Sequence, residues 1–394
     1  MSDALLSFGT EHACESRHAT VARRELPRAT RSHAAARRVS HALETLRSAV
    51  VDRGILASVA ERANYRRIWT RDAVICGLAG VAADDSAVIA GLAASLESLA
   101  AAAGPHGEIP SNVAADVSGA PPSYGGLAGR IDCGAWFAIG ACAIDSSSLR
   151  PAVDRALELY NIWELNARGL VYTPPGGCWA DEYPISGYTA TEQLLRLWAM
   201  RDAGDPAFVE LARRIAANYY LDDRDPDSDR YHPRAYERAP RCDHLVSSFS
   251  PTGYDVRFDG LANSLAIWLE VGDREQRERA AAAGKRIAAE LGGAMVPAFW
   301  PAIEVSDELE SMAGFEFRNR PGAYHNGGRW PVVNGFWGQA LLALGDRAGA
   351  EAVLADIRTA GGHEYVDTDG CLGGARTTWS AAAEVLLAAA LEGS

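Results

Sequence analysis

Apolar residues recur along this chain at spacings of three and four residues, and most of them are alanine and leucine. This spacing places them on one face of an α-helix, whereas alternating strand patterns are scarce. The sequence therefore predicts an all-α protein, with helices near 34–53, 71–81, 84–103, 131–146, 149–161, 188–203, 205–219, 258–271, 273–291, 331–345, 347–360 and 377–391.

The connections between these helices alternate in kind. Short polar turns fall near 84–86, 203–206, 272–273 and 345–346, and long segments rich in Gly, Pro, aromatic and acidic residues cover 54–70, 104–130, 162–187, 220–257, 292–330 and 361–376. If the helices run alternately up and down, all the long loops lie at one end. Long loops in a compact chain are usually functional, so this end is expected to carry the site.

Six helical hairpins closed into a ring form a double barrel of helices, the (α/α)6 barrel. An open α-solenoid shares the alternation, but solenoid repeats resemble one another and these long loops are all different. We therefore expect one barrel domain over 34–394, preceded by an N-terminal tail over 1–33.

The formal net charge of -13 argues against nucleic acid or an anionic membrane as a partner, because such surfaces bind basic proteins. A small neutral sugar fits better, and a homo-oligomer is left open. The arginines gathered between 23 and 38 are interpreted as a solvated tail rather than a nucleic-acid arm.

The seven cysteines occur singly and without a CxxC pair, as is typical of free thiols in a reducing compartment. Since neither a signal peptide nor a membrane span is evident, we predict a cytoplasmic protein. The nine histidines are scattered, which argues against a transition-metal site, although calcium among the acidic loops stays open. Phosphate-loop, dinucleotide, HExxH and GxSxG motifs are missing, which argues against nucleotide-dependent, zinc-protease and serine-hydrolase chemistry.

The first long loop ends in YRRIWTRD, directly before a helix. Asp72 in this segment could be a helix-start acid that complements the helix dipole. Trp69 favours a sugar site instead, because an indole face beside a carboxylate suits a sugar ring. Arg71 could orient the acid or bind hydroxyls.

A second acidic segment, PAIEVSDELE at 301–310, precedes YHNGGRWP at 324–331. Hydrolysis of a glycosidic bond with inversion needs a proton donor and an ionised base about 6.5–9.5 Å apart, with a water between them. Loops on opposite sides of a barrel can supply that spacing. We therefore predict Asp72 as the proton donor and a carboxylate of the second segment as the base.

Other long loops repeat an acid beside a Gly or an aromatic residue. Each acid alone is more often a cap or turn residue, but together they suggest a ring of hydroxyl acceptors. The residues expected to contact the substrate are Trp69, Arg71, Asp132, Trp179, Asp181, Glu182, Glu192, Asp259, Tyr324, His325, Arg329, Trp330, Glu364 and Trp379.

From about residue 60 to 391 the sequence resembles glycoside hydrolase family 100, the neutral and alkaline invertases. The resemblance rests on segments in the same order as in the family, among which YHNGGRWP and the C-terminal EYVDTDG with ARTTWS are the most specific, and which also include WTRDAV, GRIDCGAWF, TEQLL, RFDGLANSLAI and PAIEVSDELE. WxRD alone recurs in other (α/α)6 glycosidases.

This resemblance implies an (α/α)6 barrel that cleaves the α-glucosyl bond of sucrose with inversion and without a cofactor. Asp72 takes the acid position of the family. Counting back from Tyr324 without a gap implies Glu308 as the base, with Asp307 next, whereas matching PAIE to the family's PALE would favour Glu304. Departures beside these motifs, Arg329 among them, leave the identity of the aglycone open.

Three alternative functions remain at this point. A related α-glucosidase would act on glucosylglycerate or short malto-oligosaccharides, and Arg71 and Arg329 would suit an anionic aglycone. A sugar epimerase or isomerase on the same barrel would work through histidines, of which His325 alone lies in a strong motif. A silent binding protein would keep the ring of polar residues without turnover.

Overall fold

The computed structural model describes residues 41–60, 65–116, 120–126, 129–222, 230–311 and 317–394. Its helices are α1 (His41–Ser48), α2 (Thr70–Ala82), α3 (Ser86–Ala101), α4 (Asp132–Ala143), η2 (Ser147–Leu149, a 3-10 helix), α5 (Arg150–Trp163), α6 (Ala190–Ala203), α7 (Phe208–Tyr219), α8 (Pro233–Arg238), α9 (Gly260–Trp268), α10 (Arg274–Glu290), α11 (Asp307–Ser311), α12 (Pro331–Ala343), α13 (Arg347–Thr359) and α14 (Thr378–Gly393).

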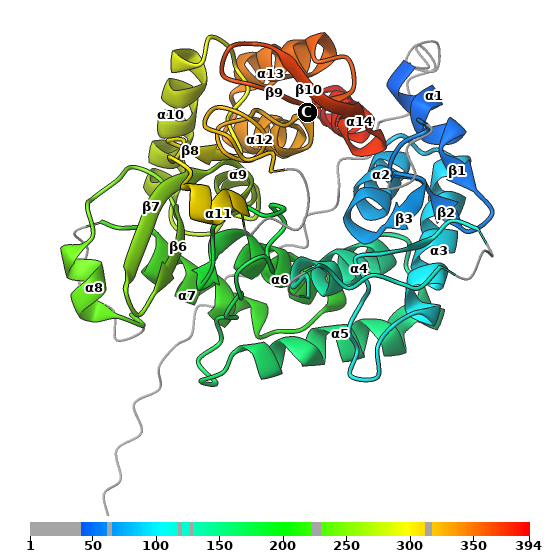
Figure 1. The fold of residues 1–394 in the computed structure, drawn as a ribbon, viewed down its shortest axis with the longest axis horizontal. Coiled ribbons are helices and arrows are strands. Elements are labelled where there is room, and N and C mark those ends of the chain that lie inside the picture. Colours follow the sequence, from blue (N-terminus) through cyan, green and yellow to red (C-terminus); the bar gives the residue numbers. More distant parts are fainter. Residues whose placement is uncertain (1–40, 61–64, 117–119, 127–128, 223–229, 312–316) are drawn as a thin grey trace, which may run out of the picture.

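Six helices form a closed inner ring. Going round it, α2 packs on α4, then α6, α9, α12 and α14, which returns to α2 (Figure 1). Outside the ring each inner helix pairs with an outer one, namely α3, α5, α7, α10, α13 and, for α14, the N-terminal α1. The expected barrel of six helical hairpins is therefore the observed architecture.

The two layers differ in how their sequences are patterned. In α2 twelve of the thirteen residues are buried, because the helix has neighbours on both sides. In α13 the buried residues are Ala350, Val353, Leu354 and Ile357, a single stripe at helical spacing. An all-round apolar helix suits the inner ring and an amphipathic one suits the outer layer.

The short turns start the outer helices through aspartate caps. Asp85 accepts a hydrogen bond from the Val88 amide, and Asp346 accepts one from Gly349. Asp273 forms a full capping box with Gln276 at the start of α10. Since such caps satisfy otherwise unpaired amides, these turns fix where the outer helices begin.

The long connections carry short strands, so the prediction of an all-α protein is only partly right. The strands are β1 (Val50–Val51), β2 (Gly54–Ile55), β3 (Arg67–Trp69), β4 (Asn112–Ala114), β5 (Tyr188–Thr189), β6 (Val246–Ser250), β7 (Gly253–Asp259), β8 (Phe299–Trp300), β9 (His363–Val366) and β10 (Leu372–Arg376). They pair antiparallel as β1–β2, β3–β4, β9–β10 and a sheet in the order β5-β6-β7-β8.

Three predicted helices change at their ends as a result. The helix predicted at 188–203 begins only at Ala190, because Tyr188–Thr189 form strand β5. The helix predicted at 258–271 begins only at Gly260, because β7 continues to Asp259 and that aspartate caps α9. Of the helix predicted at 34–53, the described part ends at Ser48, and the β1–β2 hairpin follows it. Residues 1–40 lie outside the described residues, so the predicted tail over 1–33 stays a prediction.

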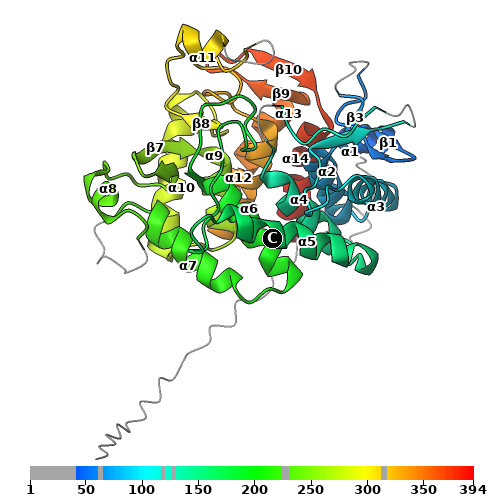
Figure 2. The same ribbon diagram turned by 60° about the horizontal axis from the view of Figure 1, so that its bottom comes forward.

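Strands β3, β8, β9 and β10 gather with α11 at one end of the molecule (Figure 2). The inner helices begin at this end, since each follows a long connection. Within the part of the chain that the structure describes, no helix combines the length and the apolar character that crossing a bilayer requires.

Candidate active site

Four buried carboxyl groups lie at the starts of four inner helices. Asp72 is the third residue of α2, Asp132 is the first of α4, Glu192 is the third of α6, and Asp259 caps α9. All four are at most 7 % exposed. The ring brings these corresponding points of successive hairpins to one end of the barrel, as the alternation of loop lengths predicted.

Burial changes the protonation of three of these four carboxyl groups. Desolvation raises the pKa of Asp72, Glu192 and Asp259 to about 7 in each case. In Asp72 the positive charge of Arg71 opposes the rise, while the negative charges of Glu364 and Asp181 add to it. Near neutral pH these carboxyls are therefore partly protonated.

Arg71 links two sides of the ring. Its Nη1 lies 3.1 Å from Asp132 Oδ2 and donates to the Trp179 carbonyl at 2.5 Å. Its guanidinium carbon also lies 5.6 Å from the centre of the Trp379 ring. Because the arginine is itself buried, this pairing compensates its charge.

Asp181 lies on the connection that precedes α6 and has a different environment. Its Oδ1 lies 2.7 Å from Arg130 Nη2 and 4.0 Å from Arg71 Nη2, and its side chain is 36 % exposed. Burial alone would raise the pKa of Asp181, but the two guanidinium groups outweigh it and the pKa is lowered. Asp181 is therefore ionised at neutral pH.

Glu364 lies in β9, on the connection that precedes α14. Burial raises its pKa, while the Tyr65 hydroxyl donates to its Oε1 at 2.8 Å and the positive charge of Arg318 opposes the rise. Asp181 and Asp72 both interact electrostatically with it. The site thus holds three carboxyl groups, Asp72, Asp181 and Glu364, close enough to influence one another's protonation.

The ring order places two of these three opposite one another. Asp181 precedes the third helix of the ring and Glu364 the sixth, so their connections lie half a turn apart (Figure 1). Asp72 belongs to the first helix, which neighbours the sixth. Of these three carboxyls, Asp181 and Glu364 are therefore the two that lie on opposed connections.

Aromatic side chains enclose this group. The His325 ring stacks on Trp330 with centroids 4.5 Å apart and meets Trp179 edge-on at 4.9 Å. Trp379 and Tyr324 in turn meet Trp330 edge-on. Burial lowers the pKa of His325 to about 3, so this imidazole is neutral.

Several buried polar atoms of the same residues have no hydrogen-bond partner among the described residues. The donors are Trp179 Nε1, Trp379 Nε1 and Arg71 Nε, the acceptors are Glu192 Oε2 and Glu364 Oε2, and His325 Nδ1 can be either. Buried polar groups are nearly always satisfied in native proteins. Donors and acceptors in such density match a ligand with many hydroxyl groups.

The acidic segment predicted to hold the base has described carboxylates that are exposed to solvent. Glu304 and Asp307 are exposed, and the charges acting most strongly on Asp72 come from Arg71, Glu364 and Asp181 instead. Glu308 belongs to α11, but its side chain lies outside the described residues. A base within 304–308 stays a prediction, which the geometry of the described carboxyls does not favour.

One predicted contact residue, Arg329, has a structural role in the fold. Arg329 donates to the carbonyl oxygens of Leu291 and Asp367, so it ties two connections together instead of presenting a free guanidinium. Trp69, in β3, and Glu182, next to Asp181, are partly buried. Tyr65, Arg130 and Arg318 are site residues that the sequence analysis did not single out, and only their nearness to predicted residues in space reveals them.

The C-terminal part of the chain, residues 239–386, matches the family model described as alkaline and neutral invertase. Among curated relatives, alkaline/neutral invertase C, mitochondrial, of Arabidopsis thaliana is 29% identical over 103 residues, which is 26% of this chain and 15% of that protein. Probable alkaline/neutral invertase A, chloroplastic, of the same plant is 30% identical over 135 residues, 33% of this chain and 21% of that protein. The resemblance predicted from the motifs is confirmed over this region, although the matches span about a fifth or less of the relatives' length.

The fold is shared with solved glycosidase structures. A mannosylglycerate hydrolase from Thermus thermophilus in complex with Tris and D-glycerate is 16% identical with a TM-score of 0.58, covering 88% of this chain and 98% of that one. A glycosidase variant in complex with glucose is 16% identical with a TM-score of 0.56, covering 89% and 94%. At this identity the likeness establishes the barrel architecture.

Proposed function

We propose that this chain is a glycoside hydrolase that cleaves the α-glucosyl bond of a small glucoside with inversion, sucrose being the leading candidate. The observation that carries the proposal is the pair Asp181 and Glu364, which lie on connections half a turn apart in the ring and interact electrostatically. Buried hydrogen-bonding atoms without partners among the described residues belong to the same set of residues. The match of residues 239–386 to the invertase family supports the same chemistry.

The proposed reaction needs one carboxyl group that is protonated and one that is ionised. The acid gives its proton to the glycosidic oxygen as the bond from that oxygen to the anomeric carbon breaks. The base takes a proton from a water that attacks this carbon from the opposite face. Asp181 and Glu364 supply the two groups, and the opposite shifts of their pKa values support different roles for them.

The remaining polar residues fit the role of holding the sugar. Arg71 and Asp132 form a buried ion pair, and the Trp179 and Trp379 indole N–H groups, which have no partner among the described residues, can donate to hydroxyls. Asp72 lies beside this pair and is coupled to both Glu364 and Asp181. The earlier prediction of Asp72 as the proton donor remains the alternative to the Asp181–Glu364 pair.

Chemical rescue of single variants decides between these assignments. We expect Asp181→Asn and Glu364→Gln each to lose at least about a thousandfold in kcat, because proton transfer and water activation each carry large factors. The acid variant regains activity on an activated substrate such as α-glucosyl fluoride, and the base variant regains it with azide. If Asp72→Asn shows the acid behaviour and neither Asp181→Asn nor Glu364→Gln does, Asp72 is the donor.

A product analysis tests the reaction itself. NMR of the sugar first released from a panel of sucrose, maltose and glucosylglycerate identifies both the substrate and the anomer. The proposal expects β-glucose as the first product from an α-glucoside. Release of α-glucose would overturn inversion, and release of no free glucose from any substrate would overturn hydrolysis.

A second candidate substrate, a glucoside of a small carboxylic acid, is favoured by Arg318. This exposed guanidinium acts electrostatically on Tyr65 and Glu364 and lies 5.7 Å from the centre of the Tyr324 ring. Arg71, in contrast, is already paired and Arg329 binds carbonyl oxygens. With an anionic aglycone, Arg318→Met should raise KM for glucosylglycerate at least about tenfold while leaving KM for sucrose within about twofold.

A further inference from the structure

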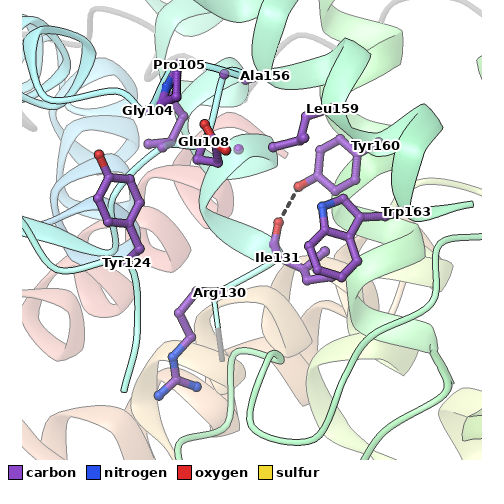
Figure 3. Close-up of a pocket in the computed structure, with 14 residues that line it drawn as sticks. Gly104, Pro105, Glu108, Tyr124, Arg130, Ile131, Ala156, Leu159, Tyr160 and Trp163 are labelled. Carbon is purple, nitrogen blue, oxygen red and sulfur yellow. Dashed lines mark hydrogen bonds between the residues drawn. The ribbon is translucent and has the colours of Figure 1, made fainter. Parts of the chain in front are cut away.

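A cavity of about 290 Å³ lies beside the candidate active site, outside the inner ring (Figure 3). It is bounded by α4, α5 and the connection between α3 and α4. Most of its wall is apolar or aromatic, contributed by Ile109, Tyr124, Leu159, Tyr160 and Trp163. Its volume is at the lower end of the range for small-molecule pockets.

The side of the cavity that faces the barrel is the segment Arg130–Ile131, and lining tyrosines hold its backbone. The Arg130 amide donates to the Tyr124 carbonyl at 2.9 Å. The Tyr160 hydroxyl donates to the Ile131 carbonyl at 2.5 Å (Figure 3). The same hydroxyl accepts from the Ala135 amide at 2.9 Å. Burial raises the pKa of Tyr160, which keeps this hydroxyl a donor.

Arg130 connects this wall to the candidate active site. Its guanidinium points away from Tyr124, Glu108 and Trp163 (Figure 3). On the far side it donates to the Cys178 carbonyl at 2.8 Å and lies 2.7 Å from the Asp181 carboxylate. A change in the position of the Arg130 backbone therefore moves the main counter-charge of Asp181.

We propose that this cavity is a binding site for a small, planar, largely apolar ligand such as an aromatic ring compound, and that its occupancy alters the Arg130–Asp181 ion pair. The second half of this inference rests on the proposed function. An anion is disfavoured because the charge of Arg130 is directed away and already paired. A sugar is disfavoured because the wall offers flat apolar surface and few free polar groups.

Calorimetry with indole tests the binding site without any need for turnover. We expect the wild-type protein to bind indole, and Leu159→Trp to abolish binding because the larger ring fills the cavity. Ile162→Trp is the matched control, since Ile162 lies on the same helix but is 65% exposed and does not line the cavity. It should bind as the wild type does.

Ala156→Leu provides a second filling variant should Leu159→Trp fail to fold. Absence of indole binding to the wild type, or binding that neither filling variant weakens, would overturn the proposed site. These results do not depend on glycoside hydrolysis, so they stand whether or not the proposed function holds.

The coupling to Asp181 is tested separately on the active enzyme. Saturating indole should shift the pH dependence of kcat/KM in the wild type and in Ile162→Trp, and should leave Leu159→Trp unchanged. Indole that binds in calorimetry but leaves the wild-type pH profile unmoved would overturn the coupling. If the wild type hydrolyses no glucoside while indole binds, the proposed function fails and the site survives.

Discussion

At the scale of single residues, the buried carboxyls dominate the behaviour of this protein. The pKa of Glu192 is raised to about 7 by burial, so the native state binds a proton that the unfolded chain releases near pH 4.5. The stability this contributes is complete below that unfolded value and is lost as pH rises to about 7. Above about pH 7 the buried, ionised carboxylate of Glu192 lowers the free energy of unfolding.

The effect of Glu192→Gln on the free energy of unfolding should therefore be more stabilising at about pH 8 than at about pH 5. The difference between the two pH values should be at most on the order of 3 kcal/mol. Thermal melts at the two pH values measure this difference. Glu210→Gln is the control, since Arg213 and Arg214 lower the pKa of Glu210 to about 2. The contribution of Glu210 to the free energy of unfolding is therefore nearly constant between these two pH values. Equal pH dependence in the wild type and Glu192→Gln would contradict the assignment.

A second residue-scale prediction concerns Arg130, which lowers the pKa of Asp181 together with Arg71. Arg130→Met removes the nearer guanidinium, at 2.7 Å, and should raise the pKa of Asp181. In the proposed reaction the limb of the kcat/KM profile that reports Asp181 should move to higher pH by about one unit. Arg150→Met, which breaks an exposed pair with Asp154, should leave the profile in place.

Sequence and structure agree best on residues that lie at the starts of helices. Asp72, Asp132, Glu192 and Asp259 stand out in the sequence because each begins a helix, and helix starts are recognisable locally. The pairing of Asp181 with Glu364 is not local, since the two are 183 positions apart and meet only through closure of the ring. The sequence therefore indicates both residues as sugar contacts but not as an opposed pair.

At the scale of elements, the helices were predictable and the strands were not. Caps such as Asp273 and glycines such as Gly204, with φ of 80° at the end of α6, mark helix ends in the sequence itself. The strands are two to seven residues long, and most are too short for an alternating pattern to register. Their pairing depends on connections that only the barrel brings together, as where β3 pairs with β4.

Close packing of inner helices yields a prediction at this scale. A Cβ atom added at Gly335 in α12 would lie 2.9 Å from Ala383 Cβ and 3.0 Å from its Cα, so the α14 backbone would have to shift. Gly335→Ala should lower the free energy of unfolding by about 1–3 kcal/mol, measured by denaturant titration. Gly126→Ala, where nothing lies within 4 Å of the added atom, should change it by less than about 0.5 kcal/mol.

At the scale of the whole molecule, the ring is closed by contacts between the two ends of the described chain. The Thr378 amide donates to the Ala57 carbonyl, and the Ser58 hydroxyl donates to the Arg376 carbonyl at 2.6 Å, across 318 positions of sequence. Closing so long a loop is costly in entropy, and the packing of α14 on α2 offsets this cost. The alternation of short and long loops in the sequence predicts the six helical hairpins. Their closure into a ring was inferred only indirectly, because the long loops differ from one another and the repeats of an open solenoid do not.

This closure makes a prediction for the fold as one unit. The Thr378 hydroxyl is buried and donates to the carbonyl oxygens of Leu56 and Ala57, both at 2.9 Å. Thr378→Val keeps the volume but removes the donor, so it should lower the free energy of unfolding by about 1–3 kcal/mol. Thr359→Val removes an exposed hydroxyl that bonds within its own helix, and should cost less than about 0.5 kcal/mol.

The shape of the unfolding curve tests closure more directly than its midpoint. If the first and sixth hairpins support each other, Thr378→Val shifts one cooperative transition, and tryptophan fluorescence and far-UV circular dichroism move together. An opened ring would instead lose α14 and α1 before the rest, and the two probes would separate. Since Glu364 reaches the candidate active site only through the connection that leads into α14, early loss of that helix would abolish activity before most of the helical signal is lost.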